Sequence, residues 1–308
     1  MRIKLCGFVV WAVFLACGLM SCQQEDRPHG VQYPIVFSNS SETRATATED
    51  DLKAGFTVYA FVQGNAGSTS FAKDVVYNAT YDVWAFASPE YWIPNTTYSF
   101  KAFYPATLTA GTLEVDNSSN ALNFTISNFD VVNHQVDVMV ASATAKVESG
   151  PVPTSGDVNG NRVNLNFKHL LACIDIQMTS AITGVIITNI TLEDADTNGS
   201  YDSATGEWSA EDSGDITITP KDGALNSTTP TSVTNDGFLV IPGDASGKTL
   251  VIETNINKTY RVTLPDKTWA KGNKYTYTAE VKQSNIIFNE PKVDEWDSEN
   301  ATGSVIIK

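Results

Sequence analysis

The chain is dominated by short apolar segments in which hydrophobic and polar residues alternate. The clearest of these segments are rich in aromatic and β-branched residues: Phe56–Val62, Tyr98–Tyr104, Tyr260–Leu264 and Tyr275–Val281. A repeat of two places one face of a strand in a core and the other in solvent. Clusters of Pro, Gly, Asn and Asp separate the segments, for example at 93–95, 156–161 and 241–244. No long helical pattern follows residue 22, so the pattern predicts an all-β fold of β-sandwiches.

A polar, Pro- and Gly-rich stretch from Glu148 to Asn161 divides the strand-rich body. Such stretches are typical of domain boundaries, and the length after residue 22 suits two tandem sandwiches better than one. We therefore predict an N-terminal β-sandwich over residues 45–155 and a C-terminal β-sandwich, with a tail, over 156–308.

At the start of the second half, the alternation of apolar and polar residues shifts by one position. They occupy odd positions in the first part, ending at Phe167, and even positions from Ile174 onward. A strand with one buried face cannot change phase without an irregularity, so we predict a bulge or bend near His169 to Leu171. The alternative is a segment that is buried on both faces.

The N-terminus has the pattern of an export signal. Arg2 and Lys4 precede an apolar run, Leu5–Met20, that is too short for a permanent membrane helix. The run ends in Leu19-Met20-Ser21-Cys22, which resembles the lipobox of bacterial lipoproteins. We predict a signal peptide over residues 1–21, lipidation of Cys22 and anchoring in the outer membrane. The acidic segment Gln23–Asp26 resembles the signal for surface exposure in Bacteroidetes-type lipoproteins.

Composition and the positions of the cysteines reduce the number of possible functions. The chain has 35 acidic and 20 basic residues, a net charge of −15, which argues against nucleic-acid partners. Cys6 and Cys17 lie in the signal and Cys22 takes the lipid, which leaves Cys173 as the one thiol of the mature chain. Its apolar neighbours indicate a buried residue and not a nucleophile.

Residues typical of catalytic or cofactor sites are sparse. The three histidines lack metal-ligand spacing, and neither a phosphate loop nor a nucleophile elbow is present, so we predict no enzyme activity and no cofactor. His169 is expected to be packed or hydrogen-bonded in a strand. One weak calcium candidate consists of Asp194, Asp196, Asn198 and Asp202, which match loop positions 1, 3, 5 and 9. Thr205 stands where such a loop needs Glu, and Asn198-Gly199 favours a β-hairpin turn instead.

The order of segments along the chain resembles the fimbrillin superfamily of Bacteroidales, in particular its Mfa-like branch of type V pilus subunits. The resemblance is carried by Ile35–Phe37, Thr43–Thr46, Phe56–Phe61, Tyr98–Pro105, Asp137–Ala141, Leu165–Ala172, Gly199–Asp202, Phe238–Pro242 and Trp269–Tyr277. It covers nearly the whole chain after Cys22. It implies two transthyretin-like β-sandwiches and a structural role in a surface fimbria that contributes to adhesion.

The resemblance also implies a maturation pathway. In this family an Arg-specific protease removes an N-terminal segment with its first strand, and a strand from another subunit fills the groove. The matching segment here is 22–44, with cleavage after Arg44 and Ala45 as the new N-terminus. Because such head-to-tail pairing does not close, it builds a filament. The alternative is an arginine that is not cleaved, in a subunit that anchors or tips the pilus.

The C-terminal tail holds two apolar runs, Ile286–Phe288 and Val305–Ile307. The family resemblance implies that the second run, with Val305, Ile306 and Ile307, is the donor strand for a neighbouring subunit. The alternative is that both runs complete the subunit's own sheets, with Trp296 packed between them.

A different class of function remains open. A surface lipoprotein that binds glycans would present aromatic platforms, for which Trp84, Tyr91 and Trp92 are candidates, although aromatics in strands usually belong to the core. The expected partners are other fimbrial subunits, the protease, the outer membrane and a host or bacterial surface ligand.

Overall fold

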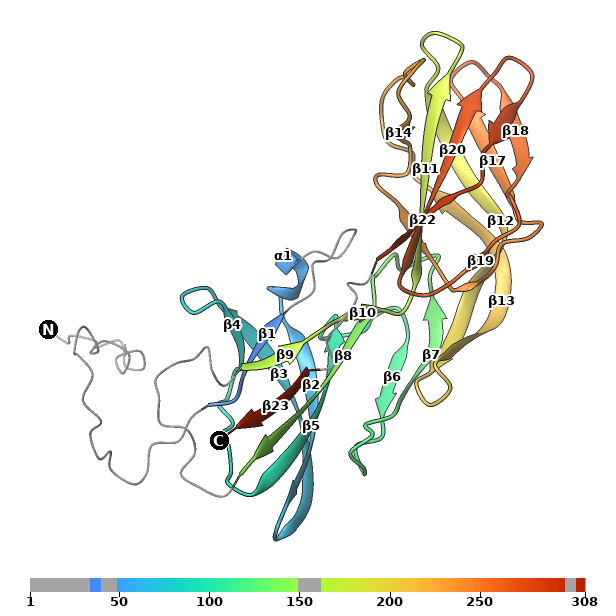
Figure 1. The fold of residues 1–308 in the computed structure, drawn as a ribbon. Coiled ribbons are helices and arrows are strands. Elements are labelled where there is room, and N and C mark those ends of the chain that lie inside the picture. The colour runs from blue at the N-terminus through green and yellow to red at the C-terminus, as the bar shows by residue number, and fades with distance from the viewer. Residues whose placement is uncertain (1–33, 40–48, 149–161, 297–302, 308) are drawn as a thin grey trace, which may run out of the picture. The chain divides into compact units, whose positions relative to one another are not determined.

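The computed structural model describes residues 34–39, 49–148, 162–296 and 303–307. These residues form β-strands with one short helix, α1 (Glu49–Leu52), which confirms the predicted all-β class (Figure 1). Within these ranges, no helix has the length and apolar character of a membrane span.

The first sheet has nine strands, and most of them come from the first half of the chain. Eight follow the order β10-β8-β5-β2-β3-β4-β1-β9, and β23 pairs with β8. Their bounds are β1 (Val36–Asn39), β2 (Phe56–Gly64), β3 (Gly67–Asn78), β4 (Val83–Phe86), β5 (Thr96–Tyr104), β8 (Met139–Val147), β9 (Arg162–Leu165), β10 (Lys168–His169) and β23 (Gly303–Ile307). The pairs are antiparallel except β1 with β9 and β23 with β8.

Two six-stranded sheets and a two-stranded ribbon make up the rest. One sheet has the order β14-β11-β20-β21, with β15 on β11 and β22 on β20; its strands are β11 (Ala172–Ser180), β14 (Thr231–Ser232), β15 (Phe238–Val240), β20 (Asn273–Val281), β21 (Ile286–Phe288) and β22 (Lys292–Glu295). The other has the order β18-β17-β12-β7-β6, with β13 on β12; its strands are β6 (Thr112–Val115), β7 (Phe124–Asp130), β12 (Ile187–Asp202), β13 (Glu207–Ile218), β17 (Thr249–Thr254) and β18 (Thr259–Thr263). The ribbon pairs β16 (Gly243–Asp244) with β19 (Thr268–Trp269).

The alternating sequence pattern determines which residues of the first sheet are buried, and these residues form the first core. In β2 and β8 every second residue is buried, as the repeat of two predicts. The buried residues of the first sheet form one cluster that contains many aromatic rings, including Phe37, Phe56, Trp84, Tyr98 and Phe100. These rings meet mostly edge to face, the arrangement that aromatic quadrupoles favour.

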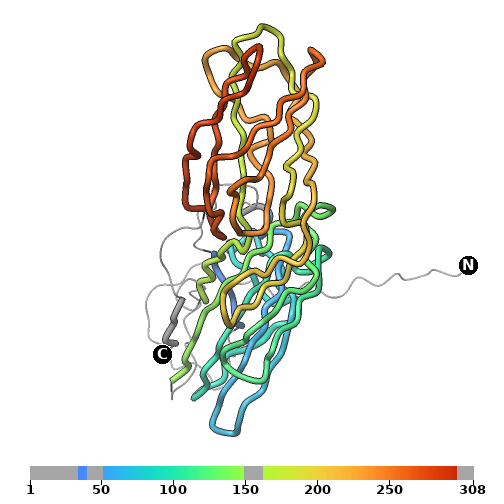
Figure 2. Tube along the Cα trace, turned by 90° about the vertical axis from the view of Figure 1, so that its right-hand side faces the viewer, coloured from blue at the N-terminus to red at the C-terminus, as the bar shows by residue number. Residues whose placement is uncertain are grey.

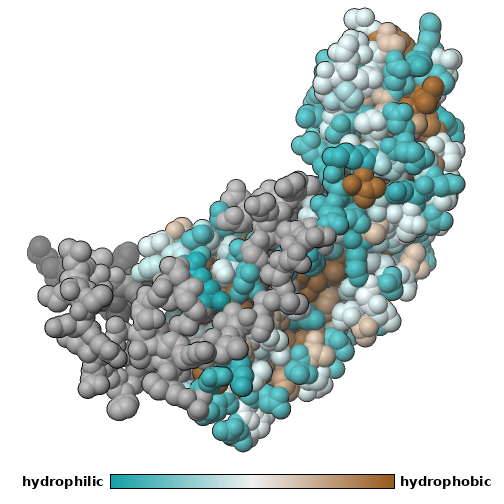
Figure 3. Space-filling view, viewed as in Figure 1, coloured by the Kyte–Doolittle hydropathy of each residue, from teal (hydrophilic) through white to brown (hydrophobic). Residues whose placement is uncertain are grey.

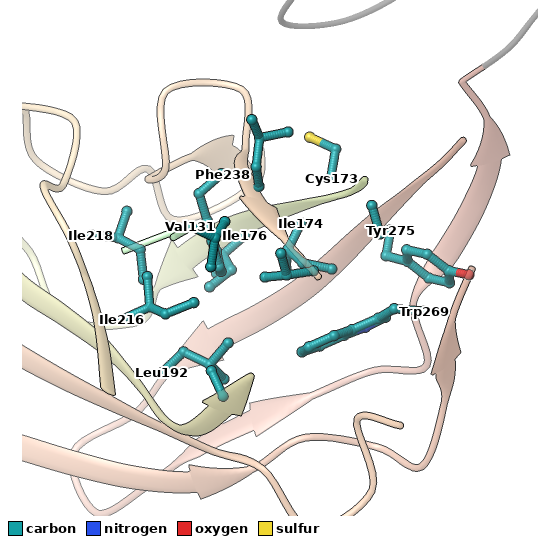
Figure 4. Packing of buried hydrophobic residues seen from close by; sticks show 14 of the residues in the cluster. Val131, Cys173, Ile174, Ile176, Leu192, Ile216, Ile218, Phe238, Trp269 and Tyr275 are labelled. Atoms are coloured by element: carbon teal, nitrogen blue, oxygen red, sulfur yellow. The ribbon is translucent and has the colours of Figure 1, made fainter. Parts of the chain in front are cut away.

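The second core lies among the strands of the second half. Figure 4 shows Ile174 and Ile176 of β11 among Leu192 of β12 and Ile216 and Ile218 of β13. On the outside of this half, hydrophilic residues predominate on the face seen in Figure 3, as its acidic sequence leads one to expect.

Strand pairing crosses the predicted boundary between the halves in both directions. From the first half, β7 pairs with β12, and from the second half, β9 and β10 join the first sheet. Figures 1 and 2 show β12 and β13 continuing alongside β7. The core of the second half accordingly includes Phe103, Phe124 and Phe129. The division of the body at residue 155 stays a prediction.

The predicted bend near His169 to Leu171 is confirmed at Leu170 and Leu171, where the chain passes from one sheet to another. β9 ends at Leu165, β10 consists of Lys168 and His169 on β8, and β11 begins at Ala172 in a different sheet. Every residue from His169 to Ile176 is buried, so this stretch follows the alternative of burial on both faces, and alternation of buried and partly exposed residues resumes at Gln177.

The predicted hairpin at Asn198-Gly199 is wrong. β12 runs without a turn from Ile187 to Asp202, and the reversal lies at residues 203–206. The Asn-Gly pair sits in a stretch of shifted register between β12 and β13. A Cβ at Gly199 would lie 2.9 Å from the Ser209 carbonyl oxygen, so this glycine permits a close backbone approach instead of a turn.

Candidate functional site

The first strand of the chain is inserted between two other strands of the first sheet. β1 pairs antiparallel with β4, with Phe37 opposite Trp84, and parallel with β9, with Phe37 opposite Val163. The Ile35 N–H donates to the Glu90 carbonyl at 2.7 Å, which ties the chain just before β1. This N-terminal segment is therefore hydrogen-bonded on both sides.

The side chains of this segment belong to the first core. Ile35 and Phe37 are 1% and 0% exposed, and Val36 is also buried. The Phe37 ring meets Phe86 and Phe100 edge to face, with centroids 5.3 and 5.4 Å apart. An aromatic residue buried this completely contributes several kcal/mol of stability, about 3–5 by truncation to Ala. Removing β1 would expose a slot lined by aromatic side chains.

The chain that leaves β1 leads directly to the predicted cleavage site. β1 ends at Asn39 and α1 begins at Glu49, and Arg44 and Ala45 occupy the interval between them. Arg44, Ala45 and the lipidation candidate Cys22 all lie outside the described residues. In sequence terms, a cut after Arg44 would leave β1 joined to the body by non-covalent contacts.

The C-terminal strand adds to the same sheet. β23 pairs parallel with β8, with Val305, Ile306 and Ile307 opposite Ala145, Lys146 and Val147, and it also lies beside β9. The first apolar run of the tail, Ile286–Phe288, forms β21 and pairs with β20 in the chain's own sheet. In this structure both runs complete sheets of the chain itself.

Trp296 marks the base of the tail. It is 1% exposed, its ring stacks on His169 with centroids 3.8 Å apart, and its backbone N–H donates to the Gly272 carbonyl at 2.7 Å. His169 is buried as predicted, and its Nδ1 is hydrogen-bonded to Asp137 Oδ2 at 2.8 Å. The tail therefore leaves a fixed point of the body.

The calcium candidates lie in a strand and not in a loop. Asp194, Asp196, Asn198 and Asp202 all belong to β12, and Lys248 is placed beside them, with its Nζ 2.8 Å from the Asp194 carbonyl and 3.8 Å from Asp196 Oδ1. Asp202 Oδ1 accepts the Ala204 N–H at 2.8 Å, as a turn residue does. In the described part of the chain, no three His, Cys, Asp or Glu side chains are grouped to hold a metal ion.

Two of the three proposed aromatic platforms are core residues. Trp84 and Trp92 are each 2% exposed, and the Trp84 indole N–H donates to the Leu52 carbonyl at 2.9 Å. Tyr91 is 39% exposed. A glycan platform needs accessible ring faces, so Trp84 and Trp92 cannot supply one in this conformation.

Cys173 is the buried thiol that the sequence predicted. It is 0% exposed, and burial raises the pKa of its thiol to about 12. A thiol with so high a pKa is almost entirely protonated near neutral pH, and the thiolate is the nucleophilic form.

The sequence does not show that β9 is the partner of β1. Val163 and Leu165 have the alternation of a strand, but nothing local shows that this strand pairs with a segment 126 positions earlier, as Phe37 with Val163 does.

Comparison with known proteins agrees with the fold. The model of a family described as fimbrillin-like matches residues 43–296. No curated protein shows significant sequence similarity. Among solved structures, a fimbrial protein from Bacteroides vulgatus is 17% identical with a TM-score of 0.56, and the match covers 86% of this chain and 100% of that one. A candidate cell adhesion protein from Bacteroides uniformis is also 17% identical, with a TM-score of 0.54 and coverage of 85% and 99%. At this level of identity the structures establish the fold.

Proposed function

The chain belongs to the fimbrillin-like family, and on that basis we propose that it is the lipid-anchored precursor of a structural subunit of a cell-surface fimbria. The family consists of structural proteins, and the chain is not an enzyme. Beyond family membership, we propose two steps in the maturation of the protein. The precursor is cut after Arg44, and the cut subunits polymerise by strand exchange and contribute to adhesion.

The observation that carries the proposal is the position of β1. It is a short strand, inserted between β4 and β9, and the chain connects it to the body through the segment that contains Arg44. Once that segment is cut, only hydrogen bonds and side-chain packing retain β1. The N-terminal piece can then dissociate, and β4 and β9 lose the strand that they share.

Loss of β1 would create a strong acceptor for another strand. The backbone groups of β4 and β9 that now bond to β1 would be unpaired, and the pockets of Ile35 and Phe37 would open to solvent. Unpaired strand edges and exposed apolar surface are both relieved when a strand with alternating apolar residues is added. A cut subunit is therefore expected to capture a partner strand.

The tail has the sequence to be that partner strand. Val305 and Ile307 are two positions apart in the sequence, as are Ile35 and Phe37, and apolar residues at this spacing would share one face of a donated strand. To be donated, β23 must first leave β8 of its own subunit. Trp296 is the fixed point from which residues 297–308 would extend.

The precursor and the cut subunit are expected at different places. Lipidation at Cys22 holds the precursor in the outer membrane at the cell surface, and cleavage after Arg44 releases the subunit into the fimbrium. Its partners are then other fimbrial subunits, the Arg-specific protease and a host or bacterial surface ligand.

The deciding experiment is to identify the N-terminal residue of the protein recovered from cells and from sheared surface filaments. Ala45 in the filament fraction, together with lipidated Cys22 in the membrane fraction, is the expected result. If all recovered protein keeps lipidated Cys22 and forms no filaments, the chain is an anchor or a non-polymerising surface lipoprotein.

A further inference from the structure

The second strand of the β2–β3 hairpin has an edge with no paired neighbour among the described strands. β2 pairs with residues 67–75 of β3, whereas β4 pairs only with residues 75–78. Residues 67–73, here called the β3 edge, lie in the part of the hairpin that extends beyond β4 (Figure 1). Residues 67–70 and Ala72 are exposed. Because much of the surface of Gly, Ser and Ala is backbone, the β3 edge is accessible to another strand.

The backbone groups of the β3 edge point outward at every second residue. The Asp74 carbonyl accepts the Ala87 N–H at 3.3 Å, so it points away from β2. In an antiparallel ladder the N–H and C=O of one residue point to the same side, and the side alternates along the strand. Ser68, Ser70 and Ala72 therefore direct their backbone groups to the β3 edge. A row of such groups is a template for pairing with another strand.

Charge distinguishes the β3 edge from β13, a strand of equal length that, among the described strands, pairs with β12 alone. Residues 67–72 carry no charged side chain, and Lys73 is paired with Glu90. The acidic residues of β13 are Glu207, Glu211, Asp212 and Asp215. Charged side chains on an edge oppose pairing, and the chain has a net charge of −15, so the acidic edge of β13 repels a second copy. The β3 edge has no such charges.

We propose that the β3 edge pairs with the β3 edge of a second copy of the chain, in an antiparallel arrangement with two-fold symmetry. Such a contact joins the same surface of both copies. With Ser70 opposite its equivalent, Ser68 faces Ala72 of the second copy, and each of these pairs exchanges two backbone hydrogen bonds. No charged side chains face each other in this register. The contact uses neither β1 nor β23, so it does not depend on strand exchange.

Disulfide trapping tests the pairing. Opposite residues in a hydrogen-bonded antiparallel pair have Cα atoms about 5.5 Å apart, a separation that a disulfide can bridge. When cells that produce the full chain are oxidised with copper phenanthroline, Ser70→Cys should give a dimer that a reducing agent separates. Ser209→Cys, exposed on β13, is the matched control and should give several-fold less dimer. The parent chain, whose Cys173 is buried, gives the background.

Two further variants test the register and the charge argument. Ser68→Cys faces residue 72 and not itself, so it should cross-link to co-produced Ala72→Cys copies several-fold more than to its own copies. Adding Ser68→Lys and Ala72→Lys to Ser70→Cys places like charges opposite each other and should reduce the dimer several-fold. Ser142→Lys with Thr144→Lys makes the same change in net charge at exposed positions of β8 and should leave the dimer unchanged.

The outcome is independent of the proposed maturation, because Arg44→Ala combined with Ser70→Cys should form as much dimer as Ser70→Cys alone. Yields are compared at equal amounts of recovered protein. The pairing is overturned if Ser70→Cys gives no dimer above the parent chain, if Ser209→Cys gives as much, or if the dimer persists when lysines stand at positions 68 and 72.

Discussion

The strands at the two ends of the described chain, β1 and β23, add to the same sheet in different ways. β1 pairs with a strand on each side and lies within the run from β10 to β9, whereas β23, among the described strands, is paired in register with β8 and lies beside β9. The segment at β1 also places Ile35, Val36 and Phe37 in the core. β1 is therefore an integral part of the sheet, whereas β23 is an addition to it. In a subunit that polymerises by strand exchange, the removal of an integral strand such as β1 creates a deep slot. An added strand such as β23 can be donated to a neighbouring subunit.

Phe37→Ala should have the largest effect on the stability of the uncut chain. It removes a ring that is 0% exposed and packed against Phe86 and Phe100, so the free energy of unfolding should fall by about 3–5 kcal/mol. Chemical denaturation monitored by tryptophan fluorescence measures this loss. Val76→Ala, in the same sheet but 54% exposed, is the control and should stay within about 0.5 kcal/mol of wild type. A small loss for Phe37→Ala would mean that β1 does not contribute to the core.

Deletion of residues 301–308 should have an intermediate effect. It removes the five residues of β23, which stand opposite Ala143 to Val147. Cross-strand pairs contribute roughly 0.2–1 kcal/mol relative to Ala–Ala, and because two of the five partners are Ala we expect the low end, about 0.2–0.4 kcal/mol each, so the unfolding free energy should fall by about 1–2 kcal/mol. The same deletion should abolish filament growth, because the donor strand is gone. Denaturation and electron microscopy of protease-treated protein provide the two measurements. A loss as large as that of Phe37→Ala would show that β23 is permanently part of its own subunit.

Arg44→Ala should leave stability unchanged and block maturation. The substitution is expected to keep β1 covalently attached, so recovered protein should retain its lipidated N-terminus and form no filaments. Arg27→Ala, another arginine of the N-terminal segment, is the matched control and should mature normally. N-terminal sequencing and filament yield are the readouts, and normal assembly by Arg44→Ala would show that cleavage there is not required.

Cys22→Ala should change neither the fold nor the pairing of β1 and β23. Without the thiol no lipid can be attached, so surface labelling of intact cells should be lost. Cys17→Ala alters a cysteine within the predicted signal and should keep both lipid and surface exposure. Metabolic labelling with a fatty acid measures the lipid, and unchanged labelling of Cys22→Ala would contradict the lipobox assignment.

The sequence by itself determined the class of fold and the position of many strands. The segments Phe56–Val62 and Tyr98–Tyr104 lie in β2 and β5, because a repeat of two is a local property that each strand carries in its own residues. The change of phase between Phe167 and Ile174 likewise located the crossing from one sheet to another. The ordered segments indicated the family, which the match over residues 43–296 confirms.

The tertiary structure decided which strands pair and which side chains are buried. β1 and β9 are joined in parallel across more than a hundred residues, and no local pattern encodes that choice. Asn198-Gly199 favours a turn locally, yet β12 continues through it because β7 and β13 pair with it on both sides. Trp84 and Trp92 were candidates for surface platforms from their sequence alone, and the fold places both in the core. The physical reason is that local sequence sets the conformation of a segment, whereas burial and register are set by long-range pairing, whose free energy exceeds a local turn preference.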